Sequence, residues 1–168
     1  MKILNYLFKL LPTKSVYAHC DIPCGIYDPH QAQLAAHTVI RMTKLILDQG
    51  IDKGDKGSGE DWLKMKHDVA RQTHVKEKHA KIVEEELETL WADYFKEEHL
   101  KEYPNLNNLI LKTVKLTGKV RQEINLEAAN ELLANVQKIA EIFWKTKKME
   151  PVRIPSGYPT EGEIVSHK

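Results

Sequence analysis

The stretch EAANELLANVQKIAEIFWKTK, residues 127–147, decides the fold. Its apolar side chains recur every three or four residues, which is the spacing of one face of an α-helix. They are Leu132, Leu133, Val136, Ile139, Ala140, Phe143 and Trp144. The stretch therefore predicts an amphipathic helix, and three further stretches upstream repeat the pattern.

The first of these helices is expected directly after Asp28, a good N-cap, with Pro29 in its first turn. Its apolar stripe is expected to consist of Leu34, Val39, Met42, Leu45 and Ile46, and it should end near Gly50. Residues 50–59 hold four glycines among charged residues and predict a loop.

A long second helix is expected after this loop, and its charged middle, Lys64–Glu88, indicates a solvated face. A third helix should open at Pro104 and end near Gly118. The apolar positions of the second are Trp62, Met65, Val69, Ile82, Leu87, Trp91 and Tyr94, and those of the third are Leu106, Leu109, Ile110, Val114 and Leu116.

Four helices with short connections predict an all-α fold, an antiparallel four-helix bundle over residues 30–148. The tail, residues 149–168, is rich in proline, glycine and serine, and we expect it to be mostly disordered. A length of 168 residues fits one domain.

Charge and hydropathy exclude some classes of partner. Lysine plus arginine total 25 and aspartate plus glutamate total 24, so a nucleic-acid partner is not expected. The longest apolar stretch is too short to span a membrane, so no membrane partner is expected.

The segment His19-Cys20-Asp21-Ile22-Pro23-Cys24 holds the two cysteines of the chain, with a histidine directly before the first. Thiolates beside an imidazole suit a transition metal. A structural zinc site would need a second cysteine or histidine pair at a defined distance, and no second cysteine pair exists. The cysteines alone would also fit a disulfide, a zinc remnant or a peroxidatic pair.

Residues 1–18 are expected to be a removable leader. They combine an early lysine, a short apolar stretch over Ile3–Leu11 and a small-residue end at Ala18, as signal peptides do. Because Lys9 interrupts the apolar stretch, export is not favoured and the protein is expected in the cytoplasm. The alternative is an amphipathic first helix. Cleavage after Ala18 would make His19 the N-terminal residue.

A free amine at His19 would change the chemistry of the segment. An α-amino group has a pKa of roughly 7.7–8.0 and gives up its proton readily. This amine and the Cys20 backbone nitrogen would chelate a metal together with the sulfurs of Cys20 and Cys24, and the imidazole could bind axially. Two nitrogens and two sulfurs in a plane favour Ni(II) or Cu(II), and thiolates favour the higher oxidation state. One-electron redox chemistry is therefore expected.

The motif His-Cys-Asp-x-Pro-Cys-Gly-x-Tyr-Asp-Pro, residues 19–29, resembles the nickel-binding hook of nickel-containing superoxide dismutases. The similarity extends to residues 90–96, to Tyr103-Pro104 and to residues 142–148. It implies disproportionation of superoxide to oxygen and hydrogen peroxide by Ni(II)/Ni(III) cycling, with one nickel ion per subunit. It also implies a homohexamer and a precursor whose leader is removed by a protease.

The resemblance also implies roles for single residues. His19, Cys20 and Cys24 would be the metal ligands. Tyr27 would line the substrate approach, where its hydroxyl orders water or superoxide, and Asp21 would lie beside it. The family hook has a cis peptide at the position of Pro23, and Gly25 is expected to allow a tight turn. Taken alone, Tyr27 could simply pack at the start of the first helix, and Asp21 and Pro23 could simply shape the turn.

Two positions depart from the family pattern. Some members hold the axial imidazole between a glutamate and an arginine, and these positions fall on Ala35 and His79. The groups that would orient His19 are therefore left open, with His79 as one candidate.

Other interpretations also fit the sequence. The histidine pairs His30/His37 and His67/His74 each share a helix face, and we read them as exposed histidines rather than a second metal site. A nickel or copper carrier would use the same hook without turnover. A structural bundle with incidental cysteines would require the motif to arise by chance.

Overall fold

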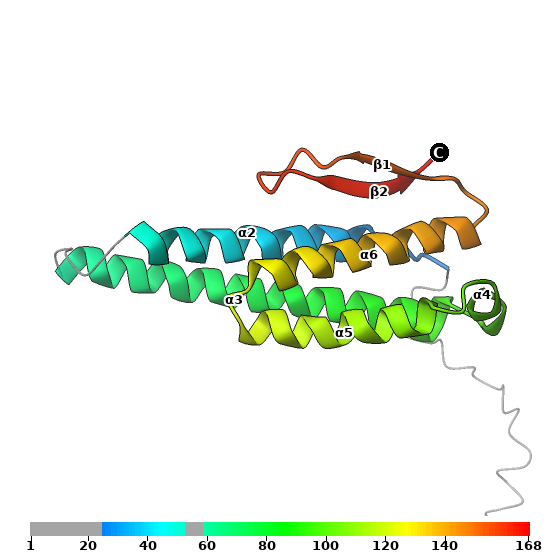
Figure 1. Ribbon diagram of the computed structural model, residues 1–168, viewed down its shortest axis with the longest axis horizontal. Helices are drawn as coiled ribbons and strands as arrows, with labels where there is room; N and C mark the ends of the chain where they lie inside the picture. Colours follow the sequence, from blue (N-terminus) through cyan, green and yellow to red (C-terminus); the bar gives the residue numbers. More distant parts are fainter. Residues whose placement is uncertain (1–24, 53–58) are drawn as a thin grey trace, which may run out of the picture.

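The structure, a computed structural model, describes residues 25–52 and 59–168, and over them the chain is mostly helical, as predicted. The four long helices are α2 (His30–Asp52), α3 (Gly59–Thr89), α5 (Leu106–Gln122) and α6 (Leu126–Thr146). Figure 1 shows α2 and α6 in one layer and α3 and α5 in the other. No helix in these ranges is long and apolar enough to cross a membrane.

The core lies where these layers meet. α2 packs against α3 and α6, and α5 packs against the same two helices. α6 supplies much of the core, since the predicted positions Leu132, Val136, Ile139, Ala140 and Phe143 are buried. Its first turn is capped by Asn125, whose side-chain oxygen accepts a hydrogen bond from the Ala128 backbone at 2.9 Å.

The apolar stripe of α2 is only partly as predicted, since Val39 and Ile46 are buried whereas Met42 and Leu45 are half-buried. Leu34 is 43% exposed, whereas Gln33 beside it is fully buried. The buried face of α2 instead runs through small and β-branched residues: Ala32, Ala35, Ala36, Val39, Ile40, Thr43 and Ile46. Small side chains let a neighbouring element approach this face closely, and a buried glutamine must then find hydrogen-bond partners.

The end of the long second helix is more irregular than predicted. After α3 the chain makes a π-helical turn, η1 (Leu90–Tyr94), in which the Phe95 N–H donates to the Leu90 carbonyl at 2.9 Å. A short helix that the sequence did not predict, α4 (Glu97–Glu102), follows. This wider turn places Leu90 and Phe95 in the core while Trp91 stays half exposed.

The third predicted helix continues past Gly118, where we expected it to end. α5 ends at Gln122 and not at the glycine, because Val120, two residues after Gly118, is buried and holds the chain in helix. Gly118 costs some helix propensity, yet a single glycine inside a packed helix is tolerated.

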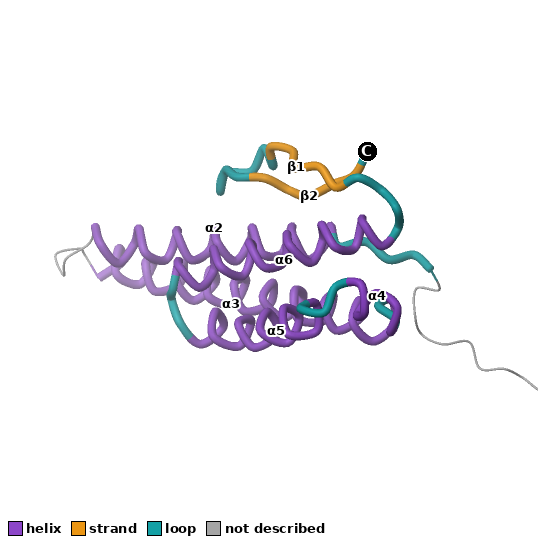
Figure 2. Tube along the Cα trace, turned by 45° about the vertical axis from the view of Figure 1, so that its right-hand side comes forward, coloured by secondary structure: helices purple, strands orange, loops and turns teal. Residues whose placement is uncertain are grey.

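The prediction of a disordered tail is wrong. Strands β1 (Pro151–Pro155) and β2 (Glu163–His167) pair antiparallel, with Arg153 opposite Val165. Two glycines of the tail are turn residues, since Gly157 and Gly162 have φ of 69° and 77°. Figures 1 and 2 show this hairpin lying over α2 and α6, on the side away from α3 and α5. The all-α prediction therefore misses a two-stranded sheet.

Candidate metal centre

The predicted ligands His19, Cys20 and Cys24 lie outside the described residues, as do the leader, Asp21 and Pro23. The structure describes the base of the hook, residues 25–29, and the elements around it. In the described part of the chain, no group of three or more histidine, cysteine or acidic side chains is placed to hold a metal ion.

Gly25 begins the described hook base in a left-handed conformation, with φ of 96°. A Cβ atom at this position would meet nothing within 4 Å, so the requirement for glycine is conformational and not steric. The predicted tight turn after Cys24 is confirmed at this residue.

The hook base passes directly into α2. The Asp28 carboxylate accepts a hydrogen bond from the His30 backbone N–H at 2.7 Å, which confirms its predicted capping role. Pro29 is buried, and its carbonyl accepts from the Gln33 N–H at 3.3 Å. The position of the hook base is therefore tied to the first turn of α2.

Tyr27 packs into an aromatic cluster formed by segments distant in the sequence. Its ring lies 5.5 Å from that of Tyr94 in η1, which in turn lies 4.6 Å from Phe143 in α6. The Tyr94 hydroxyl shares a hydrogen bond with the Thr146 hydroxyl at 2.7 Å. The structure thus brings together three of the segments that carried the family resemblance.

Lys147 lies at the same end of the molecule. Its ammonium donates to the Tyr27 carbonyl at 3.4 Å and lies 4.8 Å from the centre of the Phe143 ring. The side chain is otherwise exposed. A cation at the hook base attracts small anions toward it.

Glu86 on α3 is a neighbour that the sequence did not predict. Burial raises the pKa of its carboxyl above the usual range, and repulsion by Glu85 and by Asp28 adds to the rise. Because Asp28 contributes to the raised pKa of Glu86, this carboxyl of α3 lies near the start of α2. The sequence gives no sign of this contact, because Glu86 stands within a run of acidic residues and the contact depends on how the two helices pack.

The structure also locates the two positions that depart from the family pattern. Ala35 is buried in the core at 2% exposure. His79 is half-buried and bonds through Nδ1 to the Val75 carbonyl at 2.9 Å. A carbonyl only accepts, so Nδ1 carries the hydrogen and Nε2 of the neutral ring is an acceptor. His79 is therefore chemically able to accept a hydrogen bond from another imidazole.

His37, one of the histidines considered for a second metal site, has other partners. Its two ring nitrogens bond to the Thr160 hydroxyl at 2.8 Å and the Glu163 carbonyl at 3.2 Å. It is 3% exposed, so the expectation that it is an exposed histidine is wrong. His37 holds the hairpin and not a metal.

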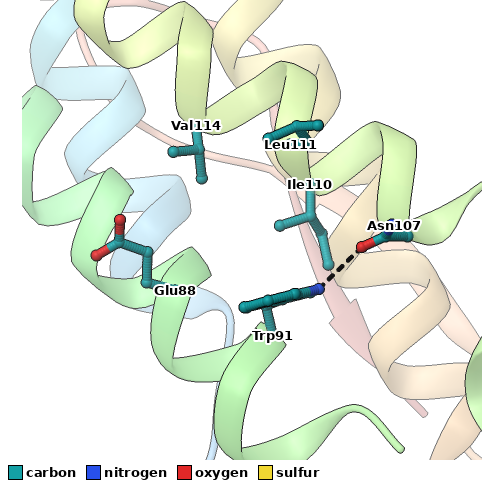
Figure 3. A pocket seen from close by; sticks show the side chains of 6 residues that line it. All are labelled: Glu88, Trp91, Asn107, Ile110, Leu111 and Val114. Atoms are coloured by element: carbon teal, nitrogen blue, oxygen red, sulfur yellow. Dashed lines mark hydrogen bonds between the residues drawn. The ribbon is translucent and has the colours of Figure 1, made fainter. Parts of the chain in front are cut away.

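An apolar groove of about 320 Å³ lies between the end of the α3–η1 segment and α5. Figure 3 shows the Trp91 ring at its edge, with the indole N–H donating to the Asn107 side-chain oxygen at 3.0 Å. Trp91 and Leu111 are each about half exposed. The other residues that line the groove are Glu88, Ile110 and Val114.

Comparison with known proteins gives one consistent result. The profile of a family described as nickel-containing superoxide dismutase matches residues 14–147. The nickel superoxide dismutase of Streptomyces seoulensis is 34% identical over 146 residues, which cover 87% of this chain and 99% of that protein. The enzyme of Streptomyces coelicolor matches with the same identity and coverage.

Solved structures of nickel-containing superoxide dismutase have a similar fold. One in the oxidized nickel-ligation state superposes with a TM-score of 0.64 at 32% identity and covers 77% of this chain and 99% of that one. A native structure gives a TM-score of 0.63 at the same identity and coverage.

Proposed function

This chain belongs to the nickel-containing superoxide dismutase family, and we propose that it disproportionates superoxide at a hook formed by residues 19–24. It is an oxidoreductase with a nickel cofactor and superoxide as its substrate. The observation that carries the proposal is the family match over residues 14–147, which includes the whole hook.

The donor groups fit nickel. His19, through its amine and imidazole, Cys20, through its backbone nitrogen and thiolate, and Cys24, through its thiolate, would hold the ion. Mixed nitrogen and thiolate donors suit Ni(II) and lower the potential for reaching Ni(III). Bound nickel would supply one-electron chemistry by cycling between Ni(II) and Ni(III), so that one superoxide would be oxidised to oxygen and another reduced, with two protons, to hydrogen peroxide.

The residues around the hook would bind and guide the substrate. Tyr27 would order water or superoxide with its hydroxyl, supported by the packing of its ring against Tyr94. Asp21 would lie beside it. Lys147 at the hook base would attract the superoxide anion, because it adds a positive charge within contact distance of the Tyr27 backbone.

The active chain would begin at His19, after removal of residues 1–18 by a processing protease. Before cleavage the His19 nitrogen is an amide and not an amine, and an amide nitrogen binds a metal only after a much costlier deprotonation. The leader would therefore delay metal loading until cleavage.

The active unit would be a homohexamer of antiparallel four-helix bundles in the cytoplasm, with one nickel ion per subunit. Exposed apolar side chains support assembly. Ile26 beside the hook is 84% exposed, and Trp91 and Leu111 line an apolar groove. Subunit contacts would cover such surface and shield the hook.

A nickel carrier is the competing function, because it would use the same ligands without turnover. The test is the decay of superoxide in the presence of purified chain that begins at His19 and is loaded with nickel. We expect fast catalytic decay that is absent from the apoprotein. Stoichiometric nickel binding with no faster decay than the apoprotein would favour the carrier and contradict the proposal.

A further inference from the structure

The C-terminal hairpin lies beyond the residues matched by the family profile, which end at 147, yet it is held on the helices by buried bonds. The Gln33 side chain on α2 is 0% exposed and makes two of them. Its amide nitrogen donates to the Val165 carbonyl at 3.0 Å, and its oxygen accepts from the Val165 N–H at 2.7 Å. A side-chain amide thus completes the edge of β2 as a neighbouring strand would.

Two further side chains bond to the same edge. The carbonyl of Glu163 accepts from the Gln137 amide of α6 at 2.6 Å and bonds to the His37 ring of α2 at 3.2 Å. Arg153 of β1 forms an ion pair with Glu141 of α6, with 2.7 Å between the guanidinium nitrogen and the carboxylate oxygen. The hairpin therefore joins α2 to α6 along one side of the molecule.

The free edge of the hairpin is poorly suited to bind another strand. Residue pairs of an antiparallel ladder alternate between hydrogen-bonded and non-hydrogen-bonded pairs. The backbone hydrogen bonds from Lys168 to Glu150 and from Ser156 to Gly162 show which pairs of this hairpin are the hydrogen-bonded ones. By this alternation the backbone of Pro151, Arg153 and Pro155 points away from β2, and both prolines lack an N–H. Prolines protect edge strands in this way. Because the free edge is protected in this way, a function for the hairpin must lie in its contacts with α2 and α6.

Those contacts lie next to the hook base. Gln33 is in the first turn of α2, where its backbone bonds to Pro29. At the other side, the His167 ring of β2 lies 4.0 Å from the ring of Trp144 in the last turns of α6. Lys147, three residues further along, donates to the Tyr27 carbonyl. The hairpin therefore contacts the start of α2 and the end of α6, the two helix ends that lie at the hook base.

We propose that the C-terminal hairpin, acting through Gln33, is a positioning element that fixes the first turn of α2 and thereby the nickel hook. Gln33 touches neither metal nor substrate in this role. The inference rests on the proposed function, since it assigns the hook to nickel. Groups that orient metal ligands indirectly typically change metal affinity by about 10- to 100-fold.

The test compares full-length variants of the chain that begins at His19. Gln33→Leu removes both bonds to Val165 at similar volume. Val165→Asp places a charge at a position that is 2% exposed and should detach the hairpin. Ile154→Asp is the matched control, because it adds the same charge to the same hairpin at a position that is 42% exposed.

We expect Gln33→Leu and Val165→Asp each to weaken Ni²⁺ binding, measured by chelator competition, by about tenfold, and Ile154→Asp to leave it unchanged. The double variant should bind no more weakly than either single one, since both remove the same coupling. Unchanged affinity in the single variants would overturn the proposal. Additive losses would also overturn it, because Gln33 would then act independently of the hairpin.

Hydrogen exchange of the apoprotein separates this inference from the proposed function. We expect faster exchange at residues 30–34 in Gln33→Leu than in the unmodified chain, with circular dichroism unchanged. If the unmodified chain failed to bind Ni²⁺, the proposed function would be wrong, and exchange would still decide whether the hairpin fixes α2. Equal exchange at these residues would overturn the positioning role.

Discussion

Lys76 on α3 is a cation with 1% exposure, and its partners explain why burial is tolerated. Its ammonium donates to backbone carbonyls at the end of α5, at 2.7 Å to Glu123, at 3.2 Å to Arg121 and also to Val120. These carbonyls have no partner within their own helix. Burial lowers the pKa of Lys76, but the bonds and the helix dipole favour a cation there.

Replacing this lysine should destabilise the protein. We expect Lys76→Met to lower the free energy of unfolding by about 2 kcal/mol, because it leaves carbonyls of α5 without a buried donor. Urea denaturation followed by circular dichroism measures the change. Lys78→Met, at an exposed position of the same helix, is the control. Equal stability of Lys76→Met and Lys78→Met would show that the three bonds contribute little.

The cysteines should matter for nickel and not for folding. We expect Cys20→Ser and Cys24→Ser each to abolish nickel retention and dismutation while the helical content is unchanged. The reason is that both thiolates would bind the metal, whereas the buried helix faces are formed by other residues. Metal analysis and circular dichroism of the same samples make the test, and retained activity in either variant would contradict the ligand assignment.

For single residues, the sequence predicted those roles that depend only on neighbouring residues in the chain. Asp28 as a cap and the need for glycine at residue 25 follow from neighbouring residues alone. Glu86 and Gln33 were missed because their roles depend on contacts from other elements. A glutamine in an apolar stripe gives no local signal that its partner is a strand 132 residues away.

Among the elements, the C-terminal hairpin shows most clearly where prediction from pattern failed. Its strands are five residues long, and two prolines lie at the ends of β1. A short hairpin with prolines and glycines at its turns has the same amino-acid composition as a disordered tail. The difference lies in the helix surface beneath, where Gln33, His37 and Gln137 supply bonds that the short strands need.

Docking of this hairpin should depend on pH through His37. Burial lowers the pKa of His37 below its ordinary value of about 6.5, although its bond to the Glu163 carbonyl opposes the shift. The docked hairpin thus favours the neutral ring, so docking is strongest above pH 6.5 and weakens as the pH falls below it. The His37 ring also contacts the Tyr158 ring edge-on, 5.2 Å between centres, and bonds to the Thr160 hydroxyl.

Hydrogen exchange at the Val165 amide between pH 7.5 and pH 5, corrected for the intrinsic rate, measures this effect. We expect protection to fall with pH in the unmodified chain and to change little in His37→Gln, which keeps polar atoms without the titration. Protection that falls equally in both would assign the pH dependence to another group.

For the whole molecule, the helical architecture was predictable because amphipathic periodicity is strong in the four long stretches. The π-turn at Leu90–Tyr94 and α4 were not, since they depend on how Phe95 reaches the core. The turn also positions Tyr94 against Tyr27, so this irregular segment matters directly for the hook base.

The nickel-loaded chain that begins at His19 is expected to sediment as a homohexamer. The exposed Ile26 and the groove at Trp91 provide apolar surface that assembly would bury. Sedimentation velocity at micromolar concentration makes the measurement. A monomer under these conditions would contradict the assembly that we propose.

The central claim is that a free amine at His19 binds the nickel, and a chain extended by one residue tests it most directly. A chain that begins Ala18-His19-Cys20 adds little bulk but converts the amine, with a pKa of roughly 7.7–8.0, into an amide. Superoxide decay and nickel content should be measured for this chain and for the chain that begins at His19. We expect dismutation to fall by orders of magnitude in the extended chain, even where nickel is still bound through other nitrogens. Equal rates of dismutation in the two chains would contradict the account.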